Sequence, residues 1–456
     1  TFPFHSVSVL NGIQEYSKDI KIIPSTGLPV LSDQVAKSVF YHNSGTPIRG
    51  LKAEYFNNTK LSGTPFKTTV DTIVSINNGW HIAAENRGFP FDHCSMRWTG
   101  FVKPEKSGKY KFTVKGFDGF RLEVGNEKVI DLWKDQGITT KSVSLQLEAG
   151  KEYAVKLEYY AGPHPVDINF AWAPDVLDFS EAVTAAKSAD ATIVCVGFNE
   201  SSEREGNDRP FELPDYQDSL INVIAGLNPK TIVVLNAGGN VDMQKWIAKV
   251  PGLLYAWYPG QEGGTAIAEI LFGKTNPSGK LPISFEKKWE DNPAFNYYYD
   301  EANSKKVSYK EGIFMGYRYY DSKHVAPQFS FGFGLSYTSF KYSDPKVTVS
   351  NKGKSPQATV SFKLSNTGNS DGAEVAQLYV RDVVSPVPRP FKELKGFSKV
   401  FLKKGETKTI TIKLDESAFA YYKTKLKKFG YDPGAFEILI GSSSANIHLK
   451  KTIILK

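Results

Sequence analysis

An apolar run that ends in a cluster of acidic side chains is the feature that most constrains the fold of this chain. The run, residues 191–197, reads ATIVCVG. It is rich in β-branched residues and lacks polar alternation, which is typical of a parallel strand buried on both faces. Ligands of such sheets bind beyond the carboxyl ends of the strands. The next segment therefore places Glu200, Glu203 and Glu205 where substrates bind.

A carboxyl group held at such a sheet edge can serve as a general acid or base. Its surroundings must tune its pKa toward the working pH. The residues alone leave a second interpretation open, a solvated polar loop, because runs of charged residues are usually exposed. In either case we expect Asp208 and Arg209 to hold the loop in shape through a charge-assisted pair.

Size and composition favour a multidomain globular protein. The chain has 456 residues, which suggests about three domains at roughly 150 residues each. The formal net charge of +8 is spread along the sequence, and its one dense basic cluster, residues 423–428, has no interleaved stacking aromatics. This pattern does not favour nucleic-acid binding. No apolar run reaches the ~18 residues of a membrane span, and the first residues do not resemble a signal peptide.

The sequence predicts neither a metal site nor a cofactor. Two cysteines, Cys94 and Cys195, are too few for a disulfide framework, and the seven histidines show no metal-ligand spacing. Cys195 lies within the apolar run and is expected to be a small core residue. The glycine-rich strings fit neither of the common nucleotide-binding patterns.

The pattern of apolar, polar and turn residues divides the chain into four regions. Residues 46–175 contain short alternating segments between turn residues, which predicts an all-β module. Residues 176–340 alternate between apolar strands and amphipathic helices, which is typical of an α/β layer. Residues 341–456 return to a β pattern and predict an antiparallel sandwich. Residues 1–45 are interpreted as an earlier part of the α/β domain, which the β module interrupts at an exposed loop.

Individual elements are predicted inside these regions. In the α/β layer we expect strands at 191–197, 231–238 and 252–260, and helices at 179–189, 216–227 and 263–273. In the carboxyl-terminal sandwich we expect strands at 347–353, 358–368, 374–382, 408–415 and 435–443.

Several ordered motifs in the last two regions resemble the carboxyl half of glycoside hydrolase family 3 β-glucosidases. In the α/β layer they are EGNDR (205–209), WYPGQEGG (257–264), GKTNPSGKLP (273–282), GYRYY (316–320) and FGFGLSYT (331–338). In the sandwich they are NTG (366–368), QLYV (377–380) and KELKGF (392–397), which resemble the fibronectin type III-like domain of that family.

The β module resembles a PA14 domain, a β-barrel-like fold associated with carbohydrates. The motifs are GLKAEYF (50–56), MRWTG (96–100), FDGFRL (117–122) and IDLW (130–133). PA14 lectins hold calcium with two adjacent aspartates, whereas the corresponding pair here is Phe117-Asp118, so we expect no calcium site. In the family, an inserted PA14 domain lies beside the active-site mouth. Phe117 and Phe120 are therefore candidates to stack on a leaving-group sugar, the alternative being that both belong to the core.

The resemblance implies a multidomain α/β plus β fold. It consists of an α/β/α sandwich interrupted by a PA14 β-barrel-like domain and followed by a fibronectin type III-like β-sandwich. The expected boundaries are 1–45 for the lead-in of the α/β domain, 46–175 for the PA14 domain, 176–340 for the α/β domain and 341–456 for the β-sandwich.

The resemblance also implies a retaining β-glucosidase that releases terminal non-reducing β-D-glucose. Such enzymes need two carboxyl groups about 5–5.5 Å apart, a nucleophile and an acid/base. In the family the nucleophile is an Asp on an amino-terminal TIM barrel, and we find no matching Ser/Thr-Asp-Trp string here. We therefore expect this chain to supply only the acid/base and to be catalytically incomplete alone. Glu205 is the expected acid/base, Glu203 is the runner-up, and Glu200 is third.

The expected partners follow from this interpretation. They are a β-glucoside or short β-linked oligosaccharide such as cellobiose, and the TIM-barrel half of the same enzyme. No cofactor, nucleic acid or membrane partner is expected, while homo-oligomerisation and the compartment, cytoplasmic or secreted, stay open. The alternatives are a β-xylosidase or other exo-glycosidase of the family, and a noncatalytic carbohydrate-binding module.

Overall fold

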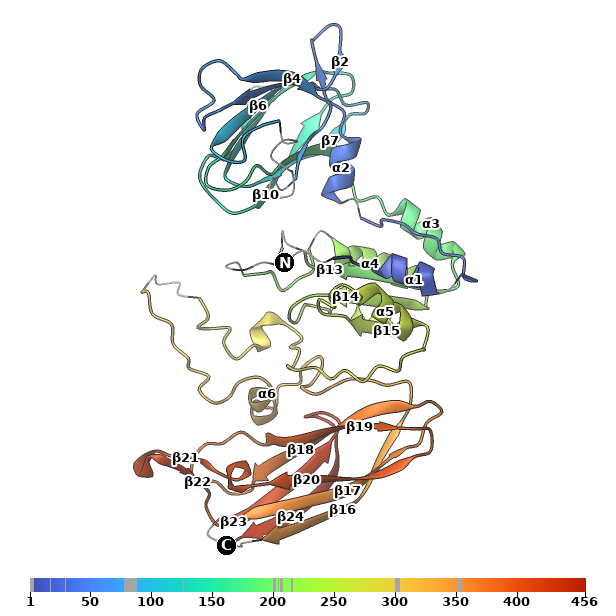
Figure 1. Cartoon of the computed structure of the whole chain (residues 1–456), viewed down its shortest axis with the longest axis vertical. Coiled ribbons are helices and arrows are strands. Elements are labelled where there is room, and N and C mark those ends of the chain that lie inside the picture. Colours follow the sequence, from blue (N-terminus) through green and yellow to red (C-terminus); the bar gives the residue numbers. More distant parts are fainter. Residues whose placement is uncertain are drawn as a thin grey trace.

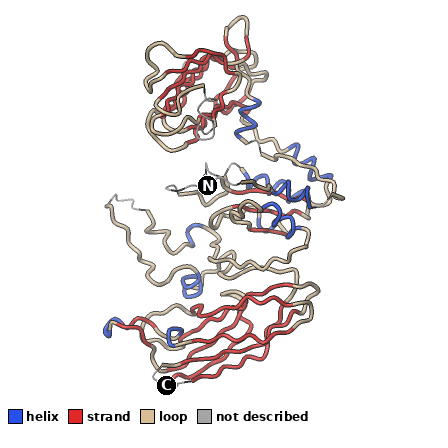
Figure 2. Tube along the Cα trace, viewed as in Figure 1, coloured by secondary structure: helices blue, strands red, loops and turns tan. Residues whose placement is uncertain are grey.

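The protein is built from three layers stacked along its long axis (Figure 1). The computed structural model describes residues 4–16, 18–28, 30–77, 88–125, 127–199, 202–203, 205, 208–214, 216–299, 304–350 and 355–456. A β module lies at one end, an α/β layer in the middle and a β-sandwich at the other end. Strands dominate both ends, and most of the helices gather between them (Figure 2).

The middle layer contains a parallel sheet of three strands in the order β13-β14-β15. The strands are β13 (Thr192–Gly197), β14 (Thr231–Asn236) and β15 (Gly252–Tyr255), and the helices of the same region are α3 (Ser180–Ser188), α4 (Gln217–Leu227) and α5 (Gly263–Leu271). All six elements were predicted from the sequence. Apolar side chains of α3 and α4 form one core with Val194, Val196 and Val233.

The prediction that β13 is buried on both faces is wrong. Val194 and Val196 are buried, but Ile193 is 36% exposed and Cys195 is exposed, so Cys195 is not a core residue. Within the described strands, β13 is an edge strand that pairs with β14. Apolar composition reports that a strand prefers burial, but it does not report whether a second layer covers both of its faces.

The amino-terminal lead-in lies against this layer. Helix α1 (Val9–Tyr16) packs on α5, and the Val7 N–H donates to the Gln261 carbonyl over 2.8 Å. Two glycines allow the close crossing. A β-carbon at Gly12 would overlap with the Gly264 carbonyl, and one at Gly264 would overlap with the Ser8 carbonyl. The helix α2 (Leu31–Lys37) then leads toward the β module (Figure 1).

The chain enters and leaves the β module side by side. The Ser38 hydroxyl accepts a hydrogen bond from the Trp172 N–H over 2.9 Å, and the Trp172 indole donates to the Val39 carbonyl over 3.0 Å. These contacts join segments that are more than 130 residues apart in the sequence. This proximity is what an insertion at a single loop requires.

The β module consists of two antiparallel sheets around one apolar core. One sheet has eight strands, with the main order β2-β1-β6-β11-β8-β9, with β3 paired to β6 and with β4 paired to β3. The other has four strands in the order β10-β7-β12-β5. In the described residues these pairings close no barrel, which corrects the expected barrel-like form. The strands are β1 (Tyr41–His42), β2 (Ile48–Arg49), β3 (Leu51–Phe56), β4 (Lys67–Asp71), β5 (Val74–Ile76), β6 (Cys94–Val102), β7 (Gly108–Gly116), β8 (Gly119–Val124), β9 (Glu127–Leu132), β10 (Thr139–Leu147), β11 (Tyr153–Ala161) and β12 (Ile168–Pro174).

The carboxyl-terminal layer is a sandwich of two antiparallel sheets. One sheet has the order β16-β17-β20, the other β19-β18-β23-β24, and β21 and β22 form a separate hairpin. The strands are β16 (Phe340–Ser350), β17 (Gln357–Asn366), β18 (Gly372–Asp382), β19 (Glu393–Leu402), β20 (Thr407–Leu414), β21 (Tyr421–Lys423), β22 (Lys428–Gly430), β23 (Gly434–Gly441) and β24 (Ile447–Leu455). Five of these were predicted, whereas β19, β21, β22 and β24 were not.

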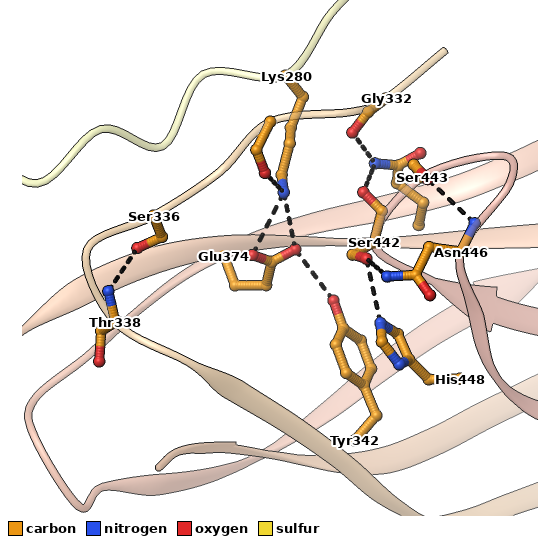
Figure 3. A network of polar contacts seen from close by, with 12 residues as sticks. Lys280, Gly332, Ser336, Thr338, Tyr342, Glu374, Ser442, Ser443, Asn446 and His448 are labelled. Atoms are coloured by element: carbon orange, nitrogen blue, oxygen red, sulfur yellow. Dashed lines mark hydrogen bonds and ion pairs between the residues drawn. The ribbon is translucent and has the colours of Figure 1, made fainter. Parts of the chain in front are cut away.

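A buried polar network joins the middle layer to the sandwich (Figure 3). Lys280 Nζ lies 3.2 Å from Glu374 Oε1, and it donates to the Gly334 carbonyl over 2.9 Å. Glu374 is buried and Lys280 is nearly so, and the Tyr342 hydroxyl donates to the same Glu374 oxygen over 3.1 Å. Burial raises the pKa of Glu374 although Lys280 opposes this shift.

An aromatic pair extends this network into the sandwich. The ring of Tyr342 stacks on His448 with ring centroids 4.4 Å apart. Burial and the nearby charge of Lys280 lower the pKa of His448. Gln377 makes a second link, because its amide donates to the carbonyls of Gly332 and Ser442 over 3.1 Å and 2.7 Å. The helix α6 (Tyr317–Lys323) adds a third contact through the Tyr317 hydroxyl, which accepts a hydrogen bond from the Leu394 N–H over 2.8 Å.

Gly12→Ala should destabilise the chain by about 1–3 kcal/mol, because the new methyl group forces α1 away from α5. Urea unfolding of the full chain measures this change. The matched control is Gly226→Ala on α4, where a β-carbon would meet nothing within 4 Å. This control should be neutral or stabilising by up to about 1 kcal/mol, since Ala is the better helix former. Equal effects of the two changes would contradict the close crossing.

Glu374→Gln should destabilise the chain by about 3–5 kcal/mol, because it leaves the buried ammonium of Lys280 without its counter-charge. The same unfolding measurement applies. The double variant Lys280→Met with Glu374→Gln should recover most of the loss, since it removes the unpaired charge and keeps an acceptor for Tyr342. Simple addition of the two single losses in the double variant would show that the ion pair is not the cause.

Candidate functional site

The acidic loop begins where β13 ends. The Phe198 N–H donates to the Asn236 carbonyl over 3.0 Å, which carries the chain along the end of β14. The Glu203 N–H then donates to the Asn199 carbonyl over 2.8 Å and turns the chain back. Of the candidate acids, Glu203 and Glu205 are described, whereas Glu200 lies outside the described residues.

The side chain of Glu203 points back onto the sheet edge. Its Oε2 accepts hydrogen bonds from the Tyr258 hydroxyl over 2.5 Å and from the Gly238 N–H over 3.2 Å. Its Oε1 lies 3.4 Å from Arg209 Nε. Gly238 follows β14 and Tyr258 follows β15, so Glu203 connects the carboxyl ends of all three strands. Both carboxylate oxygens are therefore engaged in holding the loop.

Two adjacent glycines make room for these charged side chains. A β-carbon at Gly238 would overlap with the carboxylate of Glu203, and one at Gly239 would lie 2.9 Å from a guanidinium nitrogen of Arg209. Arg209 also donates to the Asn240 carbonyl over 2.5 Å, and its guanidinium lies 4.8 Å from the ring centre of Phe198. The absence of β-carbons at these two positions thus leaves room for the ends of both charged side chains.

Tyr258 reaches Glu203 because the chain turns sharply just before it. Trp257 has a positive φ of 53°, and its carbonyl accepts a hydrogen bond from the Asn236 side chain over 2.8 Å. Burial and the hydrogen bond to Glu203 raise the pKa of Tyr258 to about 12. Its hydroxyl therefore stays protonated at neutral pH and remains a donor to the carboxylate.

Glu205 differs from Glu203 in being exposed at this edge. Further along the loop, Asp208 accepts a hydrogen bond from the Tyr298 hydroxyl over 3.1 Å. The expected pair of Asp208 with Arg209 does not form, because Arg209 pairs with Glu203 instead. Two neighbouring charges along a loop point to different sides, so proximity in the sequence did not predict the partner.

The two aromatic candidates of the β module have different environments. Phe120 is fully buried in the core of that module, so the prediction that it stacks on a sugar is wrong. Phe117 is half-buried, and its ring stacks on His164 with centroids 5.2 Å apart. Phe120 and Leu122 are alternate residues of β8 that face the core. Phe117 precedes that strand, so the alternation of the strand does not bury it.

Asp118, beside Phe117, is a buried carboxylate whose hydrogen-bond donors come from the same β module. It accepts hydrogen bonds from the Gly162 N–H over 2.8 Å and from the His164 ring over 2.7 Å. In the described part of the chain no group of three His, Cys, Asp or Glu side chains is arranged to hold a metal ion. Among the described helices, none is long and apolar enough to cross a membrane.

Two surface hollows of the molecule lie away from the acidic loop. One, of about 470 Å³, is lined by polar side chains of the β module, including His42, Lys52 and Thr99. The other, of about 430 Å³, lies between the lead-in and α3 and includes Pro24 and Thr184. Neither contains Glu203 or Glu205, which lie on an open edge of the sheet.

Sequence reasoning missed three residues that shape this edge, namely Gly238, Tyr258 and Tyr298. Tyr258 belongs to the WYPGQEGG motif, which the sequence analysis used only to recognise the family. A tyrosine near the end of a predicted parallel strand was the available signal. It could not reveal which carboxylate the hydroxyl would meet.

Comparison with known proteins places these features in a family. The Glycosyl hydrolase family 3 C-terminal domain matches residues 3–317, and the Fibronectin type III-like domain matches residues 374–444. Thermostable beta-glucosidase B of Acetivibrio thermocellus is 46% identical over 275 residues, which cover 60% of this chain and 36% of that protein. Probable beta-glucosidase H of Aspergillus clavatus is 32% identical over 483 residues, which cover 98% of this chain and 56% of that protein.

Solved structures agree with these matches. The beta-glucosidase from Kluyveromyces marxianus in complex with glucose superimposes with a TM-score of 0.70 at 29% identity, covering 99% of this chain and 56% of that one. This chain spans about half the length, or less, of the relatives named here. The family match covers more than half of the chain, and so the chain belongs to glycoside hydrolase family 3.

Proposed function

We propose that this chain is the acid/base-bearing part of a retaining β-glucosidase that removes terminal non-reducing β-D-glucose. The observation that carries the proposal is Glu205, an exposed carboxyl group at the carboxyl edge of the parallel sheet. The loop that bears it is held to that edge through Glu203, Arg209 and Tyr258. The beta-glucosidases among its relatives support the reaction class.

Exposure favours Glu205 over Glu203 as the acid/base, because Glu205 is exposed whereas Glu203 is partly buried. Both oxygens of Glu203 are engaged by Arg209, Tyr258 and Gly238, so none is available to approach a glycosidic oxygen. Glu203 instead positions the loop. A small displacement of a catalytic group lowers the rate steeply, which gives such an anchor a clear purpose.

The reaction needs a second carboxylate from polypeptide outside this chain. We infer that an Asp on an amino-terminal TIM barrel attacks the anomeric carbon while Glu205 protonates the departing oxygen. The glycosyl–Asp ester then forms, and the aglycone leaves as an alcohol. In the second step Glu205 accepts a proton from water, whose oxygen attacks the anomeric carbon and releases β-D-glucose and the Asp carboxylate.

We further infer that residues 46–175 form a PA14 domain within an α/β/α sandwich domain made of residues 1–45 and 176–340, and that residues 341–456 form the fibronectin type III-like domain. The paired entry and exit of the β module at Ser38 and Trp172 support the insertion. Phe117, half-buried on a loop of this module, remains a candidate to contact a leaving-group sugar. Cellobiose and aryl β-glucosides are the substrates that this arrangement would serve.

Glu205→Ala, made in the enzyme that joins this chain to its barrel half, should lower kcat/KM on cellobiose by about 10²–10⁴-fold, because the leaving oxygen loses its acid. On dinitrophenyl β-glucoside the loss in the glycosylation step should be much smaller, since that leaving group departs without a proton. Added azide should replace water as the nucleophile and yield β-glucosyl azide. Steady-state kinetics and product analysis measure these effects.

Glu203→Gln should lower the rate on both substrates without azide rescue, because it loosens the loop rather than removing the proton donor. Glu212→Gln, an exposed glutamate on the same segment, is the control and should retain the wild-type rate. Azide rescue in the Glu203 variant, with wild-type kinetics in the Glu205 variant, would reverse the two roles. An inactive joined enzyme that still binds cello-oligosaccharides would favour the noncatalytic binding module.

A further inference from the structure

The hairpin of β21 (Tyr421–Lys423) and β22 (Lys428–Gly430) stands out from the side of the β-sandwich (Figure 1). Its turn consists of the short 3₁₀ helix η6 (Thr424–Leu426) and Lys427, whose φ of 49° is left-handed. This hairpin contains the dense basic cluster of residues 423–428. The proposed function gives that cluster no role.

Two aromatic rings lie together on the outer face of the hairpin. Tyr422 and Phe429 are directly opposite each other in the register of the two strands. Their ring centroids lie 5.3 Å apart, and the ring planes meet at 70°. Tyr422 is 49% exposed and Phe429 is 71% exposed. In the sequence these two residues flank the basic cluster at opposite ends, and the hairpin brings both rings next to it.

The inner face of the hairpin holds it to the sandwich. Tyr421 and Lys423 alternate with Tyr422 along β21 and are less exposed than it is. The Tyr421 hydroxyl donates to Asp432 over 2.7 Å, and Lys423 pairs with the same carboxylate. The guanidinium of Arg389 lies 5.5 Å from the centre of the Tyr421 ring. The outer face is therefore positioned before a partner arrives, which lowers the entropy cost of binding.

Three lysines of the cluster carry charge that no neighbouring acid compensates. Lys425, Lys427 and Lys428 are all exposed, and none of the described acidic side chains forms an ion pair with them. Asp432, the acid that follows the hairpin, is engaged by Lys423. Since the three cations lie close together around one turn, they repel one another, and a bound anion relieves this repulsion.

We propose that the outer face of the hairpin binds an acidic polysaccharide, a chain of sugar rings that bear carboxylates. Each uronic acid unit of such a chain offers both an apolar ring face and a negative charge. The ring faces pack on Phe429 and Tyr422, and the carboxylates pair with the three lysines. Because the hairpin belongs to the sandwich, whereas the acidic loop belongs to the middle layer, this surface is separate from the proposed site of hydrolysis.

The geometry favours an acidic glycan over a nucleic acid. Single strands of DNA or RNA gain affinity by stacking successive bases on several aromatic side chains along a basic groove. Tyr422 and Phe429 meet edge to face, so they do not offer two parallel ring faces to successive bases. A sugar unit needs only one apolar surface beside a cation, and the hairpin provides that combination.

The test titrates the full chain into a fluorescently labelled polygalacturonate fragment and follows the anisotropy at low salt. The variant that combines Lys425→Gln, Lys427→Gln and Lys428→Gln should bind about tenfold more weakly, because three exposed ion pairs are lost. Added salt should remove most of this difference, since salt screens exposed charges. Phe429→Ala should weaken binding by about threefold through the loss of one ring contact.

Matched controls on the same sandwich separate the hairpin from the overall positive charge. Lys399→Gln, Lys413→Gln and Lys451→Gln together remove the same charge from exposed positions on β19, β20 and β24, and the loss should be far smaller. Phe397→Ala, at a ring that is 68% exposed on β19, should leave the affinity unchanged.

Three outcomes would overturn the proposal. Equal losses in the two lysine variants would show that net charge alone attracts the polymer. Equal affinity for neutral cello-oligosaccharides would show that the lysines are not used. Tighter binding of a labelled oligothymidylate, lost in the Lys425, Lys427 and Lys428 variant, would assign the hairpin to nucleic acid. None of these measurements needs the barrel half or hydrolysis, so their result stands apart from that of the proposed function.

Discussion

The bridge from Glu203 to the sheet edge is the interaction on which the site depends. One carboxylate gathers a guanidinium, a phenol and a backbone amide from segments that follow all three parallel strands. Hydrogen bonds to charged groups are about twice as strong as neutral ones, so this single side chain can fix a loop that carries little apolar surface. The position of Glu205 follows from this bridge, because Glu205 lies only two residues away on the same loop.

Two features of the surrounding chain make the bridge possible: space at two glycines and a sharp turn of the backbone. Gly238 and Gly239 leave space that any β-carbon would fill, and the left-handed backbone at Trp257 delivers Tyr258. The same logic of close approach recurs at the helix crossing of Gly12 and Gly264, where it holds the amino-terminal lead-in on α5. Glycines thus help to set the geometry at two places in the described part of the α/β layer where distant segments meet.

The junction with the sandwich is built by a different principle. Lys280 and Glu374 pair between the two layers with little exposure to solvent, and Tyr342 and the Gly334 carbonyl make further hydrogen bonds to them. Such a pair adds little net stability, but it penalises any other relative placement of the two layers, because each charge would then be buried alone. The network in Figure 3 therefore fixes how the sandwich supports the layer that carries the site.

The sequence by itself determined the order of the regions, the α/β elements and the family. Alternation and β-branched runs indicate which side chains prefer burial. The motifs EGNDR and WYPGQEGG indicate the family. Only the tertiary structure decided that Cys195 faces outward, that Phe120 belongs to the core, and that Arg209 pairs with Glu203 rather than Asp208. The physical reason is that periodicity describes one segment at a time, whereas exposure and pairing depend on which distant segments pack against it.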